Sequence, residues 1–183
     1  MLRIMKTLSD HVLDIIQNSI RAGATLIDIM VEENKNNDIC ILKISDNGCG
    51  MDKKTMEQAS NPFFTTRKTR KVGLGLSLLK QNAEMANGKF IINSEVNKGT
   101  KIEACFQFSN FDRPELGDIW NTLFLTMLGN ENLELSYEHN TNKGSFKFSS
   151  TEIKNNVEGV SLQNTEIRNA IIDFIKSNIE NIQ

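Results

Sequence analysis

Two glycine-rich turns, with acidic and basic residues around them, are the part of this sequence best suited to chemistry. The first turn reads D-N-G-C-G-M and begins at Asp46, and the second reads G-L-G-L and begins at Gly73. Glycines let backbone N–H groups approach a ligand closely, and a helix that starts at such a turn favours an anion at its N-terminus. Asp46 follows an apolar run and is placed to hold an amino group of the adenine type. We therefore predict that this stretch binds a nucleotide.

Polar residues at helical spacing near the N-terminus form a second candidate group. His11, Asp14, Asn18 and Arg21 are spaced i, i+3, i+7 and i+10. Residues three and four apart are neighbours on a helix surface, so these side chains form one stripe. The remainder of this helix is strongly apolar, and the stripe faces either a cleft or solvent.

Four basic residues lie between the two glycine-rich turns, in a segment over 60–72 that we expect to be irregular. They are Arg67, Lys68, Arg70 and Lys71. A solvated loop is one interpretation, and a lid that closes on phosphate groups is the other. The pattern does not indicate which of the four would contact a phosphate.

The composition narrows the class of protein. The net charge of −2 argues against a global basic field, so we do not expect nucleic-acid binding. No apolar run reaches the roughly 20 residues of a membrane span, and the N-terminus has no secretion-signal pattern. Three cysteines without C-x-x-C spacing argue for a reducing compartment. We therefore expect a cytoplasmic protein that does not enter a membrane.

Hydrophobic periodicity and turn residues predict helices and strands in an order that defines the fold class. We expect helices over 7–22, 52–59, 74–86, 116–128 and from 164 or 165 onward, and strands over 25–33, 39–45, 90–96, 101–108, 133–139 and 145–149. The strand over 39–45 is apolar on both faces, so it is expected to be central and to form a hairpin with 25–33. The order predicts an α+β protein, a two-layer sandwich with helices on one face of a mixed, mostly antiparallel sheet.

The composition shifts near residue 109, and the motifs lie before that point. We predict a ligand-binding domain over 1–108 and a C-terminal α/β extension over 109–183 that packs on it, as a docking or dimerisation surface or as additional core. Pro114 is expected near the first turn of the helix over 116–128. The residues of the last helix expected to face a core are Ile167, Ile171, Phe174, Ile175 and Ile179.

Several of these motifs occur in the order found in the GHKL ATPases. They are Asp14 with Asn18 four residues on, D-N-G-C-G from Asp46, N-P-F-F-T-T-R with G-L-G-L after it, and Gly99-Thr100. Residues 6–108 thus resemble this superfamily, which takes in gyrase B, a heat-shock chaperone, histidine kinases and the mismatch-repair ATPase. The stretch Q-N-S-I-R-A-G-A-T-L-I-D-I is similar to the start of the mismatch-repair ATPase, whereas F-F-T-T and the short lid resemble histidine kinases. The resemblance implies a Bergerat-type, histidine kinase-like ATP-binding domain.

The resemblance also implies a role for each matching residue, with ATP and Mg²⁺ as the cofactors. Asn18 helps to hold Mg²⁺ against the phosphates, Asp46 accepts a hydrogen bond from the adenine amino group, and Thr100 helps to hold the adenine. The other residues that it assigns to the ATP site are Arg21, Gly48, Gly50, Met51, Thr65, Thr66, Lys68, Gly73, Leu74, Gly75 and Leu76.

Asp14 stands where ATPases of the superfamily carry a glutamate that positions the attacking water. Aspartate keeps the carboxylate on a shorter side chain and can act as a base through a differently placed water. Three functions remain open: an ATP-dependent protein kinase of the anti-sigma or histidine kinase type, a mismatch-repair-like conformational ATPase, and a non-catalytic nucleotide-sensing module. The expected ligands are ATP or ADP and an unidentified partner protein, with a homodimer as a further possibility.

Overall fold

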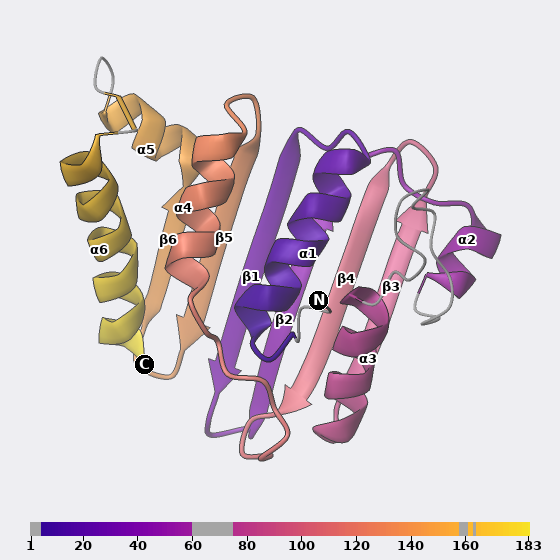
Figure 1. Cartoon of the computed structure of the whole chain (residues 1–183). Coiled ribbons are helices and arrows are strands. Elements are labelled where there is room, and N and C mark those ends of the chain that lie inside the picture. Colours follow the sequence, from indigo (N-terminus) through magenta and orange to yellow (C-terminus); the bar gives the residue numbers. More distant parts are fainter. Residues whose placement is uncertain (1–4, 60–74, 158–160, 163) are drawn as a thin grey trace.

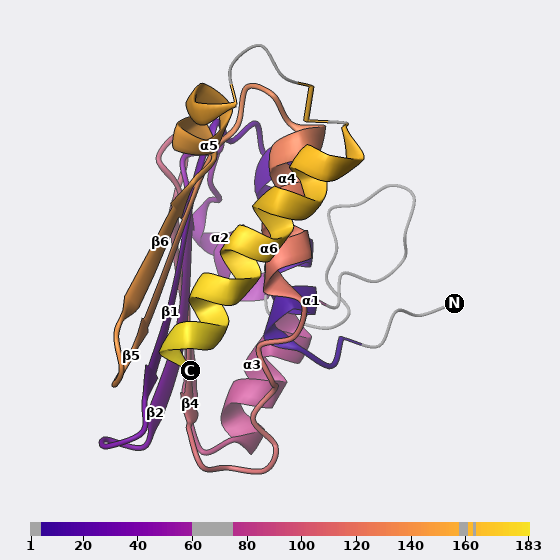
Figure 2. The same ribbon diagram turned by 90° about the vertical axis from the view of Figure 1, so that its left-hand side faces the viewer.

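The computed structural model describes residues 5–59, 75–157, 161–162 and 164–183 of the chain. These residues form a six-stranded sheet and a layer of helices that covers one of its faces (Figures 1 and 2). The helices are α1 (Leu8–Arg21), α2 (Lys53–Gln58), α3 (Gly75–Met85), α4 (Ile119–Gly129), α5 (Ser150–Asn156) and α6 (Thr165–Ile182). The strands are β1 (Leu26–Asn34), β2 (Ile39–Asp46), β3 (Lys89–Glu95), β4 (Gly99–Gln107), β5 (Glu134–Thr141) and β6 (Ser145–Ser149). The predicted α+β class is therefore confirmed.

The sheet is mixed and open, with the strand order β3-β4-β2-β1-β5-β6. Among the strand pairs of the described residues, β1 with β5 is the parallel one and the others are antiparallel. β2 lies between β1 and β4, and its inward side chains Cys40, Leu42 and Ile44 are buried. The central place of β2 and its hairpin with β1 are thus confirmed.

α1 begins at a capping box formed by Thr7 and Asp10. The N–H of Asp10 donates to Thr7 Oγ1 over 3.3 Å, and the N–H of Thr7 donates to Asp10 Oδ2 over 3.2 Å. A cap of this kind stabilises a helix by about 0.5–2 kcal/mol. The apolar side of α1 buries Val12, Ile15 and Ile16 in the core.

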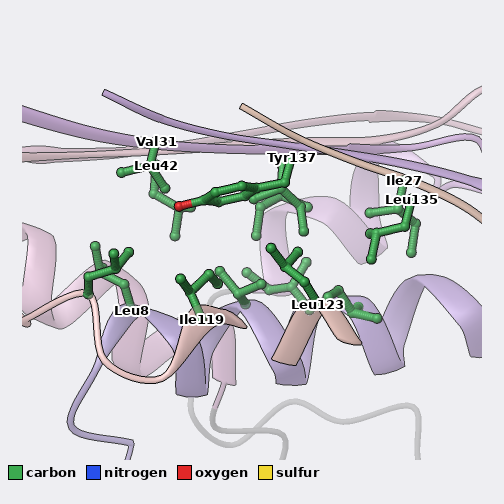
Figure 3. Packing of buried hydrophobic residues seen from close by; sticks show 14 of the residues in the cluster. Leu8, Ile27, Val31, Leu42, Ile119, Leu123, Leu135 and Tyr137 are labelled. Carbon is green, nitrogen blue, oxygen red and sulfur yellow. The ribbon is translucent and has the colours of Figure 1, made fainter. Parts of the chain in front are cut away.

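The C-terminal part of the chain extends the same sheet and shares the same core. β5 lies beside β1, with Tyr137 opposite Ile29. Figure 3 shows Ile119 and Leu123 of α4 pointing toward the sheet face on which Tyr137 lies. Residues on both sides of the predicted boundary at 108/109 are therefore packed in one hydrophobic cluster, while the boundary itself stays a prediction.

A buried polar cluster crosses the junction of β1 and β5. Glu33 Oε1 lies 3.9 Å from Arg113 Nη1, and Glu33 Oε2 lies 3.6 Å from His139 Nε2. The other ring nitrogen of His139, Nδ1, lies 3.0 Å from the hydroxyl of Tyr137. Burial alone raises the pKa of Glu33, but His139, Arg113 and Lys35 outweigh it and lower that pKa below its ordinary value. The ionised Glu33 thus links β1 to the C-terminal extension.

α4 begins at Ile119, later than the predicted residue 116. Gly117 has a φ of +71°, which turns the chain before Asp118 caps the helix. The preceding residues pair with the start of α1, where the N–H of Leu8 donates to the carbonyl of Glu115 over 2.8 Å. This pairing holds Pro114 outside the helix, so its predicted place in the first turn is wrong.

The last part of the chain differs from the prediction in two further ways. α5 was not predicted, because its seven residues carry no apolar periodicity. In α6, Ile171, Ile175 and Ile179 are buried as expected, but the side chain of Phe174 is 49% exposed. α6 lies at the margin of the helix layer (Figure 1), so only part of its apolar side meets the core.

We expect the whole chain to unfold as one unit, because the sheet and the core are continuous across the junction. A fragment ending at residue 110 would leave β1 as an edge strand and uncover the side chains that Leu123 and Tyr137 pack against. We therefore expect no cooperative urea transition for the fragment by far-ultraviolet circular dichroism. In the full chain, this signal and the fluorescence of Trp120, the single tryptophan, should change together.

A fragment over 1–110 that unfolds cooperatively would contradict this expectation. Two separate transitions in the full chain, with Trp120 reporting only one of them, would also contradict it.

Candidate functional site

A cavity of about 640 Å³ opens where α1, the end of β2 and the start of α3 meet. Its size is typical of small-molecule sites. The predicted site residues that line it are Asp14, Asn18, Arg21, Asp46, Gly50, Met51, Gly75, Leu76 and Thr100. The other lining residues are Ile15, Ser19, Ala22, Cys49, Asp52, Thr55, Ala59 and Ile102. Residues from both predicted turns are thus brought to one hollow.

Asp46, the last residue of β2, has both carboxylate oxygens engaged by hydrogen bonds. The hydroxyl of Ser19 donates to Oδ2 over 2.7 Å, and the N–H of Gly48 donates to Oδ1 over 2.9 Å. Each oxygen keeps a further lone pair, so the fixed carboxylate can still accept from a ligand. Gly48 does not line the cavity, and its contribution is the N–H that holds the Asp46 carboxylate in place.

Ser19 is a site residue that sequence reasoning missed. Its side chain is 2% exposed, on the side of α1 that also buries Ile15 and Ile16. A hydroxyl on the buried side of such a helix has to find a partner, and this one finds Asp46. That position was the available signal, but its partner depends on the packing of α1 on β2.

Ser94 of β3 is a second missed residue, and it ties the first glycine-rich turn to β4. Its hydroxyl accepts from the N–H of Met51 over 2.9 Å and lies 2.9 Å from the carbonyl of Gly99. It is also 2.9 Å from the hydroxyl of Thr100, which the sheet register places opposite Asp46. Met51 and Thr100 are therefore positioned through one shared side chain, a contact that no local pattern signals.

The tight turn before β4 requires glycine at position 99. Gly99 has a φ of +92°, and a Cβ there would lie 1.9 Å from the carbonyl oxygen of Asp46. Because no side chain intervenes, the start of β4 lies directly against the end of β2. This approach places Thr100 at the cavity beside Asp46.

Polar residues of α1 form a hydrogen-bonded row along the cavity. The side-chain amide nitrogen of Asn18 donates to Asp14 Oδ2 over 3.1 Å, and Arg21 Nη2 donates to Asn18 Oδ1 over 2.6 Å. The row confirms the cleft-facing interpretation of the predicted stripe for these three residues. It does not include His11, which is 1% exposed and buried against α3, so its predicted place in an open stripe is wrong.

The N-terminus of α3 lies directly against Asp14. A Cβ at Gly75 would lie 1.9 Å from Asp14 Oδ2, so only glycine permits this contact. A helix N-terminus carries free N–H groups and a partial positive charge, both of which favour an anion. The cavity thus combines a fixed carboxylate acceptor, an amide oxygen and an anion-favouring helix end.

Some predicted site residues lie outside the described part of the chain. They are Thr65, Thr66, Lys68, Gly73 and Leu74, and the basic residues Arg67, Arg70 and Lys71 lie there too. Over the residues that the structure does describe, no group of three or more His, Cys, Asp or Glu side chains is arranged to hold a metal. In the same part, no helix is both long and apolar enough to cross a bilayer.

The fold and the cavity together define an α+β domain with a cavity of small-molecule size, and sequence comparison assigns the family. Residues 5–110 match the model of the histidine kinase-, DNA gyrase B-, and HSP90-like ATPases. The match spans more than half of the chain, so the protein belongs to this family. The resemblance predicted from the motifs is confirmed.

Curated relatives within the family include bacterial sensor kinases. The chain is 36% identical over 87 residues to the sensor histidine kinase YvrG of Bacillus subtilis. This alignment covers 45% of this chain and 15% of YvrG. The chain is 32% identical over 98 residues to sporulation kinase B of the same species, covering 52% of this chain and 22% of the kinase. The chain therefore spans less than a quarter of the length of either relative.

Solved structures show the same fold at low sequence identity. The N-terminal domain of a DNA repair protein matches with a TM-score of 0.53 and 20% identity, covering 80% of this chain and 52% of that one. The Aquifex aeolicus MutL ATPase domain, solved with ADP, matches with a TM-score of 0.50 and 14% identity, covering 85% of this chain and 68% of that one. Since the family model ends at residue 110, these matches include part of the C-terminal extension.

Replacing Gly99 with alanine should destabilise the protein. The left-handed backbone costs a residue with a Cβ about 1–2 kcal/mol, and the collision with the Asp46 carbonyl adds to this. The free energy of unfolding in urea should fall by at least that amount. Gly129→Ala is the matched control, because nothing lies within 4 Å of a Cβ there. Equal stability of the two variants would contradict the proposed need for glycine at position 99.

Proposed function

We propose that this protein binds ATP with Mg²⁺ and, acting with a partner protein, transfers or hydrolyses the γ-phosphate. One observation carries the proposal. A single cavity collects the fixed carboxylate of Asp46, the Asp14–Asn18 pair and the N-terminus of α3. Membership of a family of ATPases supports ATP as the nucleotide.

Asp46 is the proposed adenine-binding residue. The two donors Ser19 and Gly48 hold its carboxylate at the cavity wall, which leaves lone pairs for an exocyclic amino group. Thr100 stands opposite in the sheet and supplies a hydroxyl to the same base. Met51 lines the cavity beside them and offers an apolar surface for the ring. A guanine carries a carbonyl where adenine has its amino group, so it lacks the donor that Asp46 would accept.

The phosphates are proposed to lie between α1 and the start of α3. Backbone N–H groups at Gly75 and Leu76 offer donors, and Arg21 adds positive charge on the same cavity wall. Mg²⁺ fits this donor set, because it is commonly held by one or two protein oxygens with phosphates and waters completing its shell. Asn18 Oδ1, which accepts from Arg21 over 2.6 Å and has a second lone pair, is the oxygen we propose for it. Bound Mg²⁺ would neutralise phosphate charge during transfer.

Asp14 is the proposed general base. Its carboxylate lines the cavity next to the α3 N-terminus, and Asn18 donates a hydrogen bond to it. In this orientation it can take a proton from the attacking group, either a water or a hydroxyl of a partner protein. The names of the curated relatives YvrG and sporulation kinase B support phosphotransfer over hydrolysis.

The experiment that tests the function is incubation of the purified chain with γ-labelled ATP, with and without cell extract. Labelled protein indicates phosphotransfer, and free phosphate from the pure chain indicates hydrolysis. Tight ATP binding with neither product would support a nucleotide-sensing module.

Replacing Asp46 with alanine should weaken ATP binding by about tenfold or more. The change removes a charged acceptor, and hydrogen bonds to charged groups are worth about 1.5–3 kcal/mol. Isothermal calorimetry with ATP and GTP measures both affinity and base preference. Asp173→Ala, which removes an exposed aspartate from α6, is the control and should bind as the wild type does. Equal affinity of the wild type for ATP and GTP would rule out the adenine role.

Asn18 and Asp14 should separate binding from chemistry, because one acts through the metal and the other on the attacking group. Asn18→Ala should weaken Mg²⁺-dependent nucleotide binding and abolish turnover with it. Asp14→Asn keeps the shape and removes the base, so binding should survive while turnover falls by about 10²–10⁴-fold. Calorimetry in Mg²⁺ and in chelator gives the first readout, and labelled phosphate gives the second. Wild-type turnover by Asp14→Asn would show that Asp14 is not the base.

A further inference from the structure

We propose that His11 is a positioning residue of this site, which fixes the first turn of α3 against Asp14 and supports nucleotide binding only while its ring is neutral. The inference rests on the proposed function, because it concerns the same nucleotide. It adds a residue outside the cavity wall and a pH range in which the site works.

His11 lies at the interface between α1 and α3. Its ring is 1% exposed, and its Nε2 is 2.9 Å from the side-chain nitrogen of Asn82 on α3. Its other nitrogen, Nδ1, is buried without a hydrogen bond. Along α1, His11 stands one turn before Asp14 and on the same side. The ring therefore joins the helix that carries Asp14 to the helix whose N-terminus faces Asp14.

His11 would control the contact between Gly75 and the Asp14 carboxylate, in which Gly75 has no side chain that could set the distance. Gly75 approaches Asp14 so closely that a Cβ would lie 1.9 Å from Oδ2. The spacing between Asp14 and the α3 N–H groups consequently depends on the packing farther along α3. Leu79 and Ala83 supply the buried apolar part of that packing, and His11–Asn82 supplies a directional polar contact. Loss of the polar contact leaves α3 free to slide relative to Asp14.

The geometry at Asn82 selects the neutral ring. Because an amide nitrogen faces Nε2, that ring nitrogen accepts and the hydrogen sits on Nδ1. Protonation would place an N–H against the amide N–H₂ of Asn82 and would put a positive charge on a buried ring. The amide would have to turn or α3 would have to move, and either change disturbs the Gly75–Asp14 contact.

The surroundings keep the ring neutral near pH 7. Burial lowers the pKa of His11 below its ordinary value of 6.5, while Asp10, Asp14 and the Gly75 backbone oppose this without cancelling it. β2, which also packs against α1, carries Cys40 on its inner face, and burial raises the pKa of that thiol to about 12, so it stays neutral. The described face of α4 toward the core carries apolar side chains and the uncharged Thr122 and Thr126.

The direction of the pH effect follows from the lowered pKa. The unfolded chain takes up the proton near pH 6.5, and the folded chain takes it up at lower pH. Stability from the neutral ring is therefore complete above pH 6.5 and is lost as the pH falls toward the folded pKa. Nucleotide binds the folded protein, so its affinity should fall around the lowered folded pKa of His11, in proportion to the fraction of neutral His11 rings.

The test uses the fact that the chain has only two histidines. In His139→Gln, the remaining imidazole signal in NMR reports the titration of His11, and His139 is a matched buried histidine that does not line the cavity. Calorimetry gives the Kd for ADP at fixed Mg²⁺ from pH 5.0 to 7.5. We expect the Kd of wild type and His139→Gln to rise as His11 titrates. Saturating ADP should lower the pKa of His11 further, because linkage is reciprocal.

Three single variants and one double variant separate the polar contact from the charge. His11→Gln keeps an acceptor for Asn82 but cannot be protonated, so its Kd should lack the acid-range rise seen in the wild type. His11→Leu and Asn82→Leu each remove the contact, and at pH 7.5 both should bind ADP more weakly than His11→Gln does. The double variant should bind no more weakly than either single one, because both changes break the same contact. Protonation of ADP itself is common to all variants and cancels in the comparison.

The inference is overturned if His11→Gln follows the wild-type pH profile and ADP leaves the His11 titration unchanged, while both proteins bind ADP. The proposed function then stands without it. Absence of ADP and ATP binding by the folded wild type at every pH would overturn the proposed function and the inference together. If His11→Leu does not fold, the pH profile of His11→Gln still decides the matter.

Discussion

The way α1 packs on the sheet is the constraint on which the rest of the site depends. Val12, Ile15 and Ile16 are buried in the core, and each such side chain stabilises the fold by about 1.5–3 kcal/mol. This burial fixes the rotation of α1, so Asp14 and Asn18 can only face the cavity. The Ser19–Asp46 hydrogen bond then joins the helix to the end of β2. The orientation of this one helix therefore fixes the positions of Asp14 and Asn18, and it also holds Asp46, the proposed acceptor for the adenine.

The second constraint is the close approach of backbone segments around the cavity. Gly99 lets the start of β4 lie against the carbonyl of Asp46, and Gly75 lets the start of α3 lie against the Asp14 carboxylate. Both approaches use the absence of a Cβ, so the distances are set by surrounding packing and hydrogen bonds. Ser94 supplies that support near β4, and we propose that His11 supplies it near α3. The cavity is thus held from behind by residues outside the glycine-rich turns.

The C-terminal extension is part of the same fold in the described structure. β5 continues the sheet beside β1, and α4 covers the sheet face that also receives α1. The buried Glu33 and His139, with the partly exposed Arg113, join the two parts through polar contacts in addition to the apolar core. A partner protein that binds the extension would therefore contact elements that share one sheet and one core with α1.

The sequence by itself determined the elements other than α5 and about half of the cavity residues, because these follow from local rules. Helical spacing placed Asp14, Asn18 and Arg21 on one side of α1, and the glycines marked the turns beside Asp46 and Gly75. Alternation and turn residues likewise gave the strands of an α+β fold. Tertiary structure alone decided the contacts between distant segments. They are the hydrogen bond of Ser19 to Asp46, the contacts of Ser94 that tie the first glycine-rich turn to β4, and the contact of the buried His11 with Asn82. The pairing of Leu8 with Glu115, which keeps α4 from starting before Ile119, is another. Such contacts depend on which buried surfaces meet, and that choice is made by packing over the whole chain and not by any local pattern.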